Sequence, residues 1–111
     1  MDPTEVSPEF YQVIFENERV RVLSYRDRPG DQTRPHSHPD SVMVTLSSFR
    51  RRISAGGRSV EVELGAGEVR WVGAQEHAGE NIGDTDTASI FIELKEPNPG
   101  APGPAALGPS S

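Results

Sequence analysis

Hydrophobic and polar residues alternate along several short stretches of the chain, and this period of two is typical of β-strands. The alternating apolar residues are Val20 and Val22; Val42, Val44 and Leu46; Val60, Val62 and Leu64; Val69 and Trp71; and Ile90, Ile92 and Leu94. Side chains two residues apart on a strand share one face of the sheet, so we expect these residues to face a hydrophobic interior.

Turn-forming residues separate these stretches at intervals typical of an all-β protein. The clusters include Arg28-Pro29-Gly30-Asp31, Ala55-Gly56-Gly57-Arg58 and Gly65-Ala66-Gly67. No segment keeps the apolar period of a helix over about twelve residues. The pattern predicts about seven or eight short strands that form one antiparallel β-barrel or jelly roll over residues 10–96.

The composition agrees with a single turn-rich domain. The chain has 111 residues and a mass of 12.1 kDa, with 11 glycines and 10 prolines, and chains of this length usually form one domain. Residues 1–9 and the Pro-, Gly- and Ala-rich residues 97–111 offer little apolar surface, so we expect both segments to be flexible. There is no stretch of ~20 apolar residues and no export signal, so we expect a cytoplasmic location.

Charge and residue usage exclude several classes of function. The net charge is −6, which disfavours binding to nucleic acid, and cysteine is absent, which excludes disulfides, thiolate metal sites and a cysteine nucleophile. We expect a small-molecule substrate and neither a nucleic-acid nor a membrane partner. Because so small a β-domain buries a modest core, we also expect a homodimer.

The 3 histidines lie in two short stretches, Pro35-His36-Ser37-His38-Pro39 and Gln75-Glu76-His77. On a strand, His36 and His38 would point to the same side, and His77 from a later strand could complete a set of three nitrogen ligands for a divalent metal. The alternative interpretation is an exposed histidine pair in a proline-bounded loop together with an unrelated surface histidine. Spacing by itself leaves both interpretations open.

Two motifs resemble those of the cupin superfamily. Gly30, followed by five residues and His36-Ser37-His38, is similar to the first motif, Gly-x5-His-x-His-x(3,4)-Glu-x6-Gly. Gly67, Gly73 and the run from His77 to Asn81 are similar to the second, Gly-x5-Pro-x-Gly-x2-His-x3-Asn. The likeness covers residues 20–94 and implies a cupin-type double-stranded β-helix. It extends to small single-domain bacterial cupins, including those associated with beta-alanine degradation.

The sequence departs from the first motif where that motif has a metal-binding glutamate. Val42 and Met43 stand at the two positions open to that residue, so the resemblance implies a site of three histidines alone. Asp40 could supply a carboxylate instead, although an aspartate after proline more often forms a turn. Three neutral imidazoles leave a divalent ion with its full charge and with open coordination positions.

The resemblance implies a metal-dependent enzyme, most concretely a dioxygenase that acts on a small organic or amino acid with Fe(II). Zinc, nickel or manganese are possible metals as well. A metal-dependent cyclase or isomerase and a non-catalytic small-molecule binding or sensing protein are the alternatives.

Other residues complete the predicted pocket. They are Gln75, Gly79 and Asn81, which share the face of His77 if the strand alternates, together with Met43 and Trp71. If the parity of Val42 and Val44 continues, Arg50 and Arg52 face the interior, where a guanidinium can bind a substrate carboxylate. A bulge before this segment would turn Arg51 inward instead.

Overall fold

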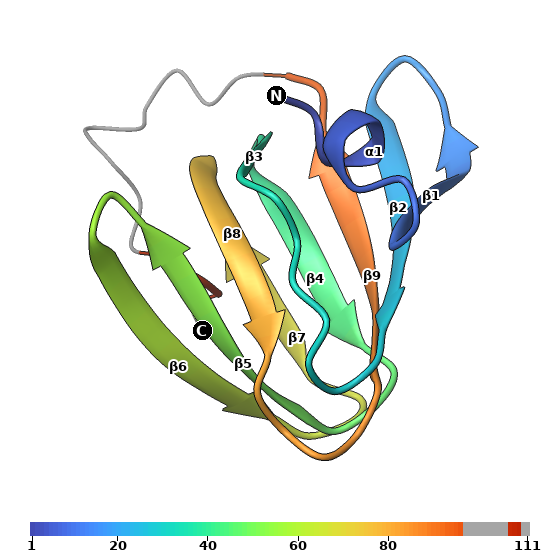
Figure 1. Cartoon of the computed structure of the whole chain (residues 1–111). Coiled ribbons are helices and arrows are strands. Elements are labelled where there is room, and N and C mark those ends of the chain that lie inside the picture. The colour runs from blue at the N-terminus through green and yellow to red at the C-terminus, as the bar shows by residue number, and fades with distance from the viewer. Residues whose placement is uncertain (97–106, 110–111) are drawn as a thin grey trace.

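The structure is a computed structural model and describes residues 1–96 and 107–109 (Figure 1). Its elements, in chain order, are α1 (Pro3–Val6), β1 (Tyr11–Glu16), β2 (Val20–Asp27), β3 (His36–His38), β4 (Ser41–Thr45), β5 (Phe49–Ala55), β6 (Arg58–Leu64), β7 (Val69–Val72), β8 (Gln75–Asn81) and β9 (Thr87–Leu94). The predicted all-β class is confirmed, and the strands form a 5-stranded and a 4-stranded antiparallel sheet.

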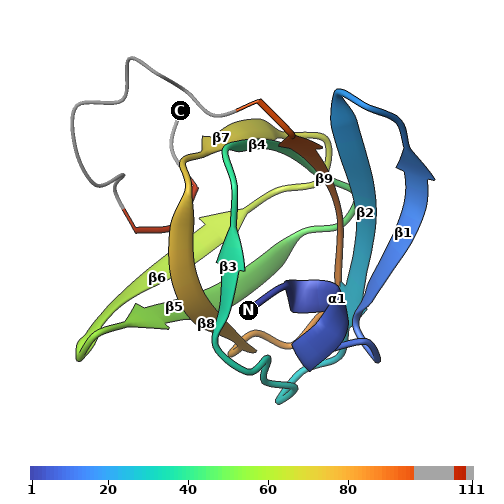
Figure 2. The same cartoon turned by 90° about the horizontal axis from the view of Figure 1, so that it is seen from above.

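The two sheets face each other and enclose the interior, as the view from above shows (Figure 2). The first sheet has the strand order β1-β2-β9-β4-β7, and the second has the order β3-β8-β5-β6. Strands that are consecutive in the chain therefore alternate between sheets at several points. This arrangement brings β3, β8 and β5, which carry the candidate site residues, into one sheet.

The chain passes from one sheet to the other at two neighbouring corners. Only Pro39 and Asp40 separate β3 from β4, and only Gly73 and Ala74 separate β7 from β8. Pro39 has no N–H to give to a strand ladder, and Asp40 Oδ1 accepts a hydrogen bond from Ala74 N at 2.8 Å. Asp40 thus ties the two corners together and acts as a turn residue.

Glycine turns connect the strands where the sequence predicts them. The hairpin between β5 and β6 has a two-residue loop, Gly56-Gly57, with φ of 55° and 80°. Both central residues of a type I′ turn need positive φ, which glycine adopts without a steric penalty.

On β2, β4, β7 and β9, strands of the larger sheet, the face that points inward differs from the prediction. On β4, Ser41, Met43 and Thr45 are buried, whereas Val42 and Val44 are only half-buried. The same reversal places Trp71 on the outside of β7, where its side chain is 39% exposed. The predicted period of two is correct, but the face that points to the interior carries many of the polar and aromatic residues of this sheet.

The interior is built largely from aromatic side chains. Tyr11, Leu23 and Tyr25 form the buried cluster, and Phe10 and Phe91 pack against it. The ring centroids of Tyr11 and Tyr25 lie 4.6 Å apart with tilted planes, an arrangement that aromatic pairs prefer over face-to-face stacking.

The N-terminal segment contacts the barrel. The first residues form the short helix α1, which begins after the N-cap residue Asp2, and Asp2 forms an ion pair with Arg21 on β2. Flexibility of residues 1–9 remains a prediction, and the predicted flexible tail lies mostly outside the described residues, at 97–106 and 110–111. Within residues 1–96 and 107–109, no helix has the length and apolar character needed to cross a membrane.

Candidate metal centre

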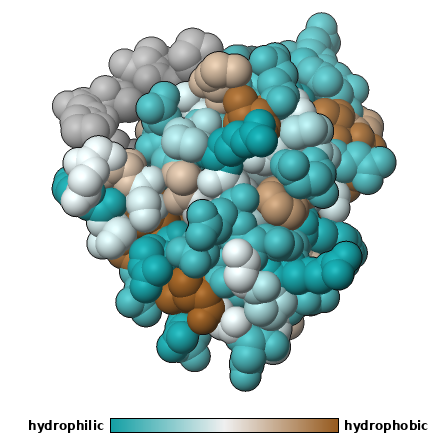
Figure 3. All heavy atoms as spheres, in the orientation of Figure 1, coloured by the Kyte–Doolittle hydropathy of each residue, from teal (hydrophilic) through white to brown (hydrophobic). Residues whose placement is uncertain are grey.

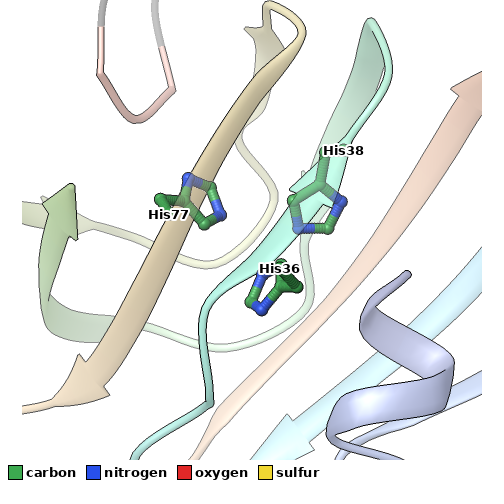
Figure 4. Close-up of side chains that lie close together, drawn as sticks. All are labelled: His36, His38 and His77. Atoms are coloured by element: carbon green, nitrogen blue, oxygen red, sulfur yellow. The ribbon is translucent and has the colours of Figure 1, made fainter. Parts of the chain in front are cut away.

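The three histidines meet on the inner side of the smaller sheet (Figure 4). β3 pairs with β8 in a register that sets His36 directly opposite His77, and His38 lies two residues further along the same face. One nitrogen from each ring lies within 4.8 Å of the others. The ring centroids are 4.7 to 5.0 Å apart. The structure therefore brings together the three residues that the sequence proposes as metal ligands.

An oxygen atom holds the Nδ1 side of each imidazole. His36 Nδ1 lies 2.7 Å from the carbonyl oxygen of Arg34, His38 Nδ1 lies 3.2 Å from Glu93 Oε2, and His77 Nδ1 lies 2.7 Å from Gln75 Oε1. Carbonyl, amide and carboxylate oxygens accept hydrogen bonds, so Nδ1 carries the hydrogen in each ring. The lone pair then resides on Nε2, the arrangement that holds metal-binding histidines in other proteins.

The Nε2 atom of His38 is the test of whether these residues fit a metal ion. It is buried and has no hydrogen-bond partner, one of two such side-chain atoms among the described residues. Buried polar atoms nearly always have a partner, and a divalent cation would provide one here. His36 Nε2 accepts a hydrogen bond from the Tyr11 hydroxyl at 3.3 Å. The donor set fits a metal that imidazole nitrogens bind well, such as iron, nickel or zinc.

The protonation state of the histidines also suits metal binding. Burial lowers the pKa of His77 to about 3 and that of His36 to about 4, and the imidazole of His38 is the second cause in both cases. Both rings are therefore neutral near pH 7. Neutral imidazole is the form that binds metals.

A chain of ion pairs links His38 to the N-terminal segment. Glu93 is 2% exposed, and its Oε1 accepts a hydrogen bond from Arg21 Nε at 2.8 Å, while its Oε2 faces His38. Arg21 in turn pairs with Asp2 beside helix α1. This carboxylate fixes the orientation of the ligand, and the arginine balances its charge.

A small cavity of about 50 Å³ lies next to the histidines. It is lined mainly by apolar side chains, among them Met43, Phe49, Ile53, Val72 and Phe91. A water molecule needs roughly 10–15 Å³ of such space, so the cavity has room for a few waters or for a ligand of similar size. Met43 lines this cavity, at a position where the cupin motif can have glutamate.

The expected arginine anchors are wrong, because Arg51 rather than Arg50 or Arg52 points inward. Arg50 is exposed and Arg52 pairs with Glu80, whereas Arg51 is 7% exposed and lines the cavity. The alternation of β4 does continue into β5 as expected, but the face shared by Val42 and Arg50 is the outer one. The prediction was therefore wrong about which face of the strand points to the interior.

Arg51 is held by a buried polar network. Its Nη1 donates to Asp27 Oδ2 at 2.6 Å and to Thr87 Oγ1 at 3.0 Å, and its Nη2 donates to the Tyr25 hydroxyl at 3.0 Å. Gly79 makes room for the guanidinium, because a Cβ atom there would lie 2.9 Å from Nη2. Gly79 was predicted to be a pocket residue, and the space that it leaves is filled by Arg51.

Asn81, Gln75 and Trp71 differ in their relation to the site. The Asn81 amide contacts Asp27 at 3.1 Å and the Thr85 carbonyl at 2.8 Å, so it orders the end of β8 and does not orient a histidine. Gln75 does contact His77, and its Oε1 also accepts a hydrogen bond from Gly108 N at 2.8 Å. Trp71, expected in the pocket, lies on the outer face of β7.

Several site residues were missed at the sequence level. They are Tyr11, Tyr25, Asp27, Glu93 and the segment Gly108–Pro109, which also lines the cavity. Glu93 had one local signal, since it is an acidic residue between Ile92 and Leu94 in an apolar strand. Tyr11 and Asp27 contact His36 and Arg51, which are distant in the sequence.

Comparison with known proteins places this geometry in a family. No family model matches the sequence, and no curated protein is similar to it. Solved structures do match. A double-stranded β-helix protein from Klebsiella pneumoniae is 20% identical with a TM-score of 0.60 and covers 91% of this chain and 83% of its own. The polyketide cyclase RemF from Streptomyces resistomycificus is 18% identical with a TM-score of 0.57, covering 80% and 66%. These two support the predicted fold.

A cupin domain from Bordetella pertussis Tohama I is more similar in sequence. It is 31% identical, has a TM-score of 0.72, and the alignment covers 78% of this chain and 92% of that domain. This identity extends over nearly the whole of a single-domain relative. The resemblance seen in the two histidine motifs is thereby confirmed, and the chain belongs to the cupin superfamily.

Proposed function

We propose that the protein binds one divalent metal ion through the Nε2 atoms of His36, His38 and His77 and uses it to transform a small organic acid. The observation that carries the proposal is the buried, unpartnered Nε2 of His38 beside two other imidazoles with their Nδ1 hydrogens held by oxygens. A metal bound by three neutral imidazoles acts as a Lewis acid, and Fe(II) in such a site supports dioxygenase chemistry.

The cavity supports a substrate with an apolar body and one anionic group. Arg51 is the one charged side chain among the described residues that line the cavity together with His36 and His77. It gives three hydrogen bonds to Asp27, Thr87 and Tyr25, and a guanidinium has five N–H donors. The remaining donors are available to a carboxylate of a small organic or amino acid.

Tyr11 supplies a proton donor next to the site. Its hydroxyl points to His36 Nε2, and burial raises its pKa, so the hydroxyl keeps its proton at neutral pH. When Nε2 of His36 is engaged elsewhere, this hydroxyl is free to donate to an oxygen of the substrate. The apolar walls exclude bulk water from the same space.

Metal analysis of protein purified without a histidine tag tests the proposal first. We expect close to one equivalent after supply of iron, nickel, manganese or zinc, and much less in His77→Ala, with unchanged far-UV circular dichroism. Less than about a tenth of an equivalent of every metal in the wild type would overturn the metal site.

Oxygen uptake then tests the reaction class. Consumption of oxygen by the iron form with a small carboxylic or amino acid supports the dioxygenase. Turnover by the zinc form under nitrogen would instead indicate a cyclase or isomerase. Binding without turnover would indicate a binding or sensing protein. A cytoplasmic location is part of the proposal and is tested by fractionation.

Glu93 offers a test of how the site is positioned. Glu93→Gln keeps an acceptor oxygen for His38 but removes the charge, and we expect metal affinity to fall by about 10- to 100-fold. Titration calorimetry measures this change. Glu80→Gln, which alters an exposed ion pair on β8, is the control and should leave the affinity unchanged.

A further inference from the structure

A short segment near the C-terminus forms part of the wall of the metal-site cavity. Residues 107–109 belong to no helix or strand, and Gly108 and Pro109 line the cavity together with His77. Gly108 N donates a hydrogen bond to Gln75 Oε1 at 2.8 Å, and the same oxygen lies 2.7 Å from His77 Nδ1. The segment therefore lies against a side chain that contacts a candidate metal ligand.

The same segment packs on apolar side chains of β5 and β6, beside which it is drawn in red in Figure 1. Gly108 is buried, and a Cβ atom there would lie 3.7 Å from Val60 Cγ2, 3.7 Å from Val62 Cγ2 and 3.9 Å from Ile53 Cγ1. These are ordinary van der Waals distances. The φ of Gly108 is 78°, in the left-handed region that glycine adopts without a steric penalty. The backbone conformation, and not a lack of space, therefore favours glycine here.

The candidate metal ligands have almost no contact with solvent while the segment is in this position. His36 is 1% exposed and His38 is 4% exposed. The side of the molecule in Figure 3 is mostly hydrophilic and has only separate apolar areas, so the apolar lining of the cavity does not form an open patch on this side. A substrate reaches the histidines only if part of the cavity wall moves.

The parts of this wall differ in how firmly their backbone is held. Apart from Gly108 and Pro109, the described residues that line the cavity lie on strands, with the exception of Thr33. Thr33 N donates to the Gly79 carbonyl at 2.8 Å, and Gly79 N donates to Thr33 Oγ1 at 2.8 Å, so this loop is tied to β8. Residues 107–109 are held by the hydrogen bond of Gly108 N and by apolar contact. Segments that lack ladder hydrogen bonds open at a lower free energy than strands do.

We infer that residues 107–109 act as a lid, which covers the metal-site cavity and leaves it to admit a small ligand. Departure of the lid uncovers Ile53, Val60 and Val62 and opens the cavity beside His77. The role of the lid in substrate entry rests on the proposed function. Its opening does not, because the contacts that hold it involve no metal.

Acylation of the metal-free protein by diethyl pyrocarbonate tests the lid. The reagent attacks neutral imidazole, and peptide mass spectrometry separates His77 from the other two histidines. Gly108→Ala places a Cβ on a residue with a φ of 78°, which disfavours the closed lid and should raise the acylation rate of His77 by about tenfold. Gly67→Ala is the matched control, because Gly67 has a φ of 79° and lies in the turn between β6 and β7. It should leave the rate unchanged.

Equal acylation rates of His77 in the wild type and in Gly108→Ala overturn the lid, as does a rate that Gly67→Ala raises as much as Gly108→Ala does. Both variants keep the full chain, and far-UV circular dichroism checks that they fold. Metal content does not enter this experiment, so the lid and the metal site can fail separately.

Hydrogen exchange provides a second measurement on the unaltered protein. Gly108 N–H is released when the lid opens, whereas Gly79 N–H on β8 is released only when the barrel itself opens. We expect Gly108 N–H to exchange about 100-fold faster than Gly79 N–H or more, after correction for the intrinsic rates. Equal protection of the two amides would mean that the segment opens only with the whole barrel, and would overturn the inference.

Discussion

The two faces of the five-stranded sheet carry opposite chemistry on the same strands. The inner face holds tyrosines, hydroxyl residues and two buried carboxylates, Asp27 and Glu93, whereas the outer face holds aliphatic side chains together with Trp71. Each buried carboxylate has an arginine within hydrogen-bond distance, at 2.6 Å for Asp27 and 2.8 Å for Glu93. A polar interior is thus possible because its charges are paired, and it leaves room for a site.

Acid should destabilise the interior of the barrel, where the smaller sheet places His36 and His77 opposite the inner face of the larger one. The pKa values of His36 and His77 in the folded chain are about 4 and 3, below the ordinary value of 6.5. Between pH 6.5 and 3 the unfolded chain therefore binds more protons than the folded chain, so stability falls as the pH falls. We expect a loss on the order of 5 kcal/mol over this range in the metal-free protein.

Urea unfolding at several pH values in the presence of a chelator measures this loss. His77→Gln should show a shallower dependence on pH than the wild type, since it removes one of the two groups. An equally steep dependence in both proteins would contradict the assignment to the histidines.

Removing a buried charge should be nearly as damaging. Asp27→Ala leaves the Arg51 guanidinium without its carboxylate partner in the interior, and breaking a buried pair in this way costs about 3–5 kcal/mol. Glu80→Ala removes one of the two carboxylates near Arg52, the next residue on β5, whose side chain is partly exposed. That control should cost at most about 1 kcal/mol in a urea melt. Similar losses in both variants would show that the Asp27–Arg51 pair contributes little.

The outer face should tolerate polar substitution. Val69 is 58% exposed, and Val69→Thr replaces one of its methyl groups by a hydroxyl. We expect a change within about 0.5 kcal/mol in urea unfolding. A loss above about 1 kcal/mol would mean that this side chain belongs to the core of the chain.

The sequence predicts the strands well because strand formation depends on local alternation and on turn residues such as Gly56 and Gly57. It predicts the three histidines because two of them lie two residues apart and all three match a family motif. The inner face is not predictable in this way. Which face points inward depends on pairs such as Asp27 with Arg51, which lie on different strands. Hydrophobicity wrongly predicts that Val42 and Trp71 face the interior.

One amide oxygen of Gln75 accepts hydrogen bonds from both His77 Nδ1 and Gly108 N, at 2.7 and 2.8 Å. The contact of residues 107–109 with the barrel and the orientation of a metal ligand therefore share one acceptor. Coupling between two binding events is reciprocal. If contact with this segment strengthens metal binding through His77, metal binding strengthens the contact with the segment by the same free energy. Ending the chain at residue 106 removes this segment, and Gln75→Leu removes the shared acceptor. The two changes should have non-additive effects on metal affinity, although neither alters a ligand atom.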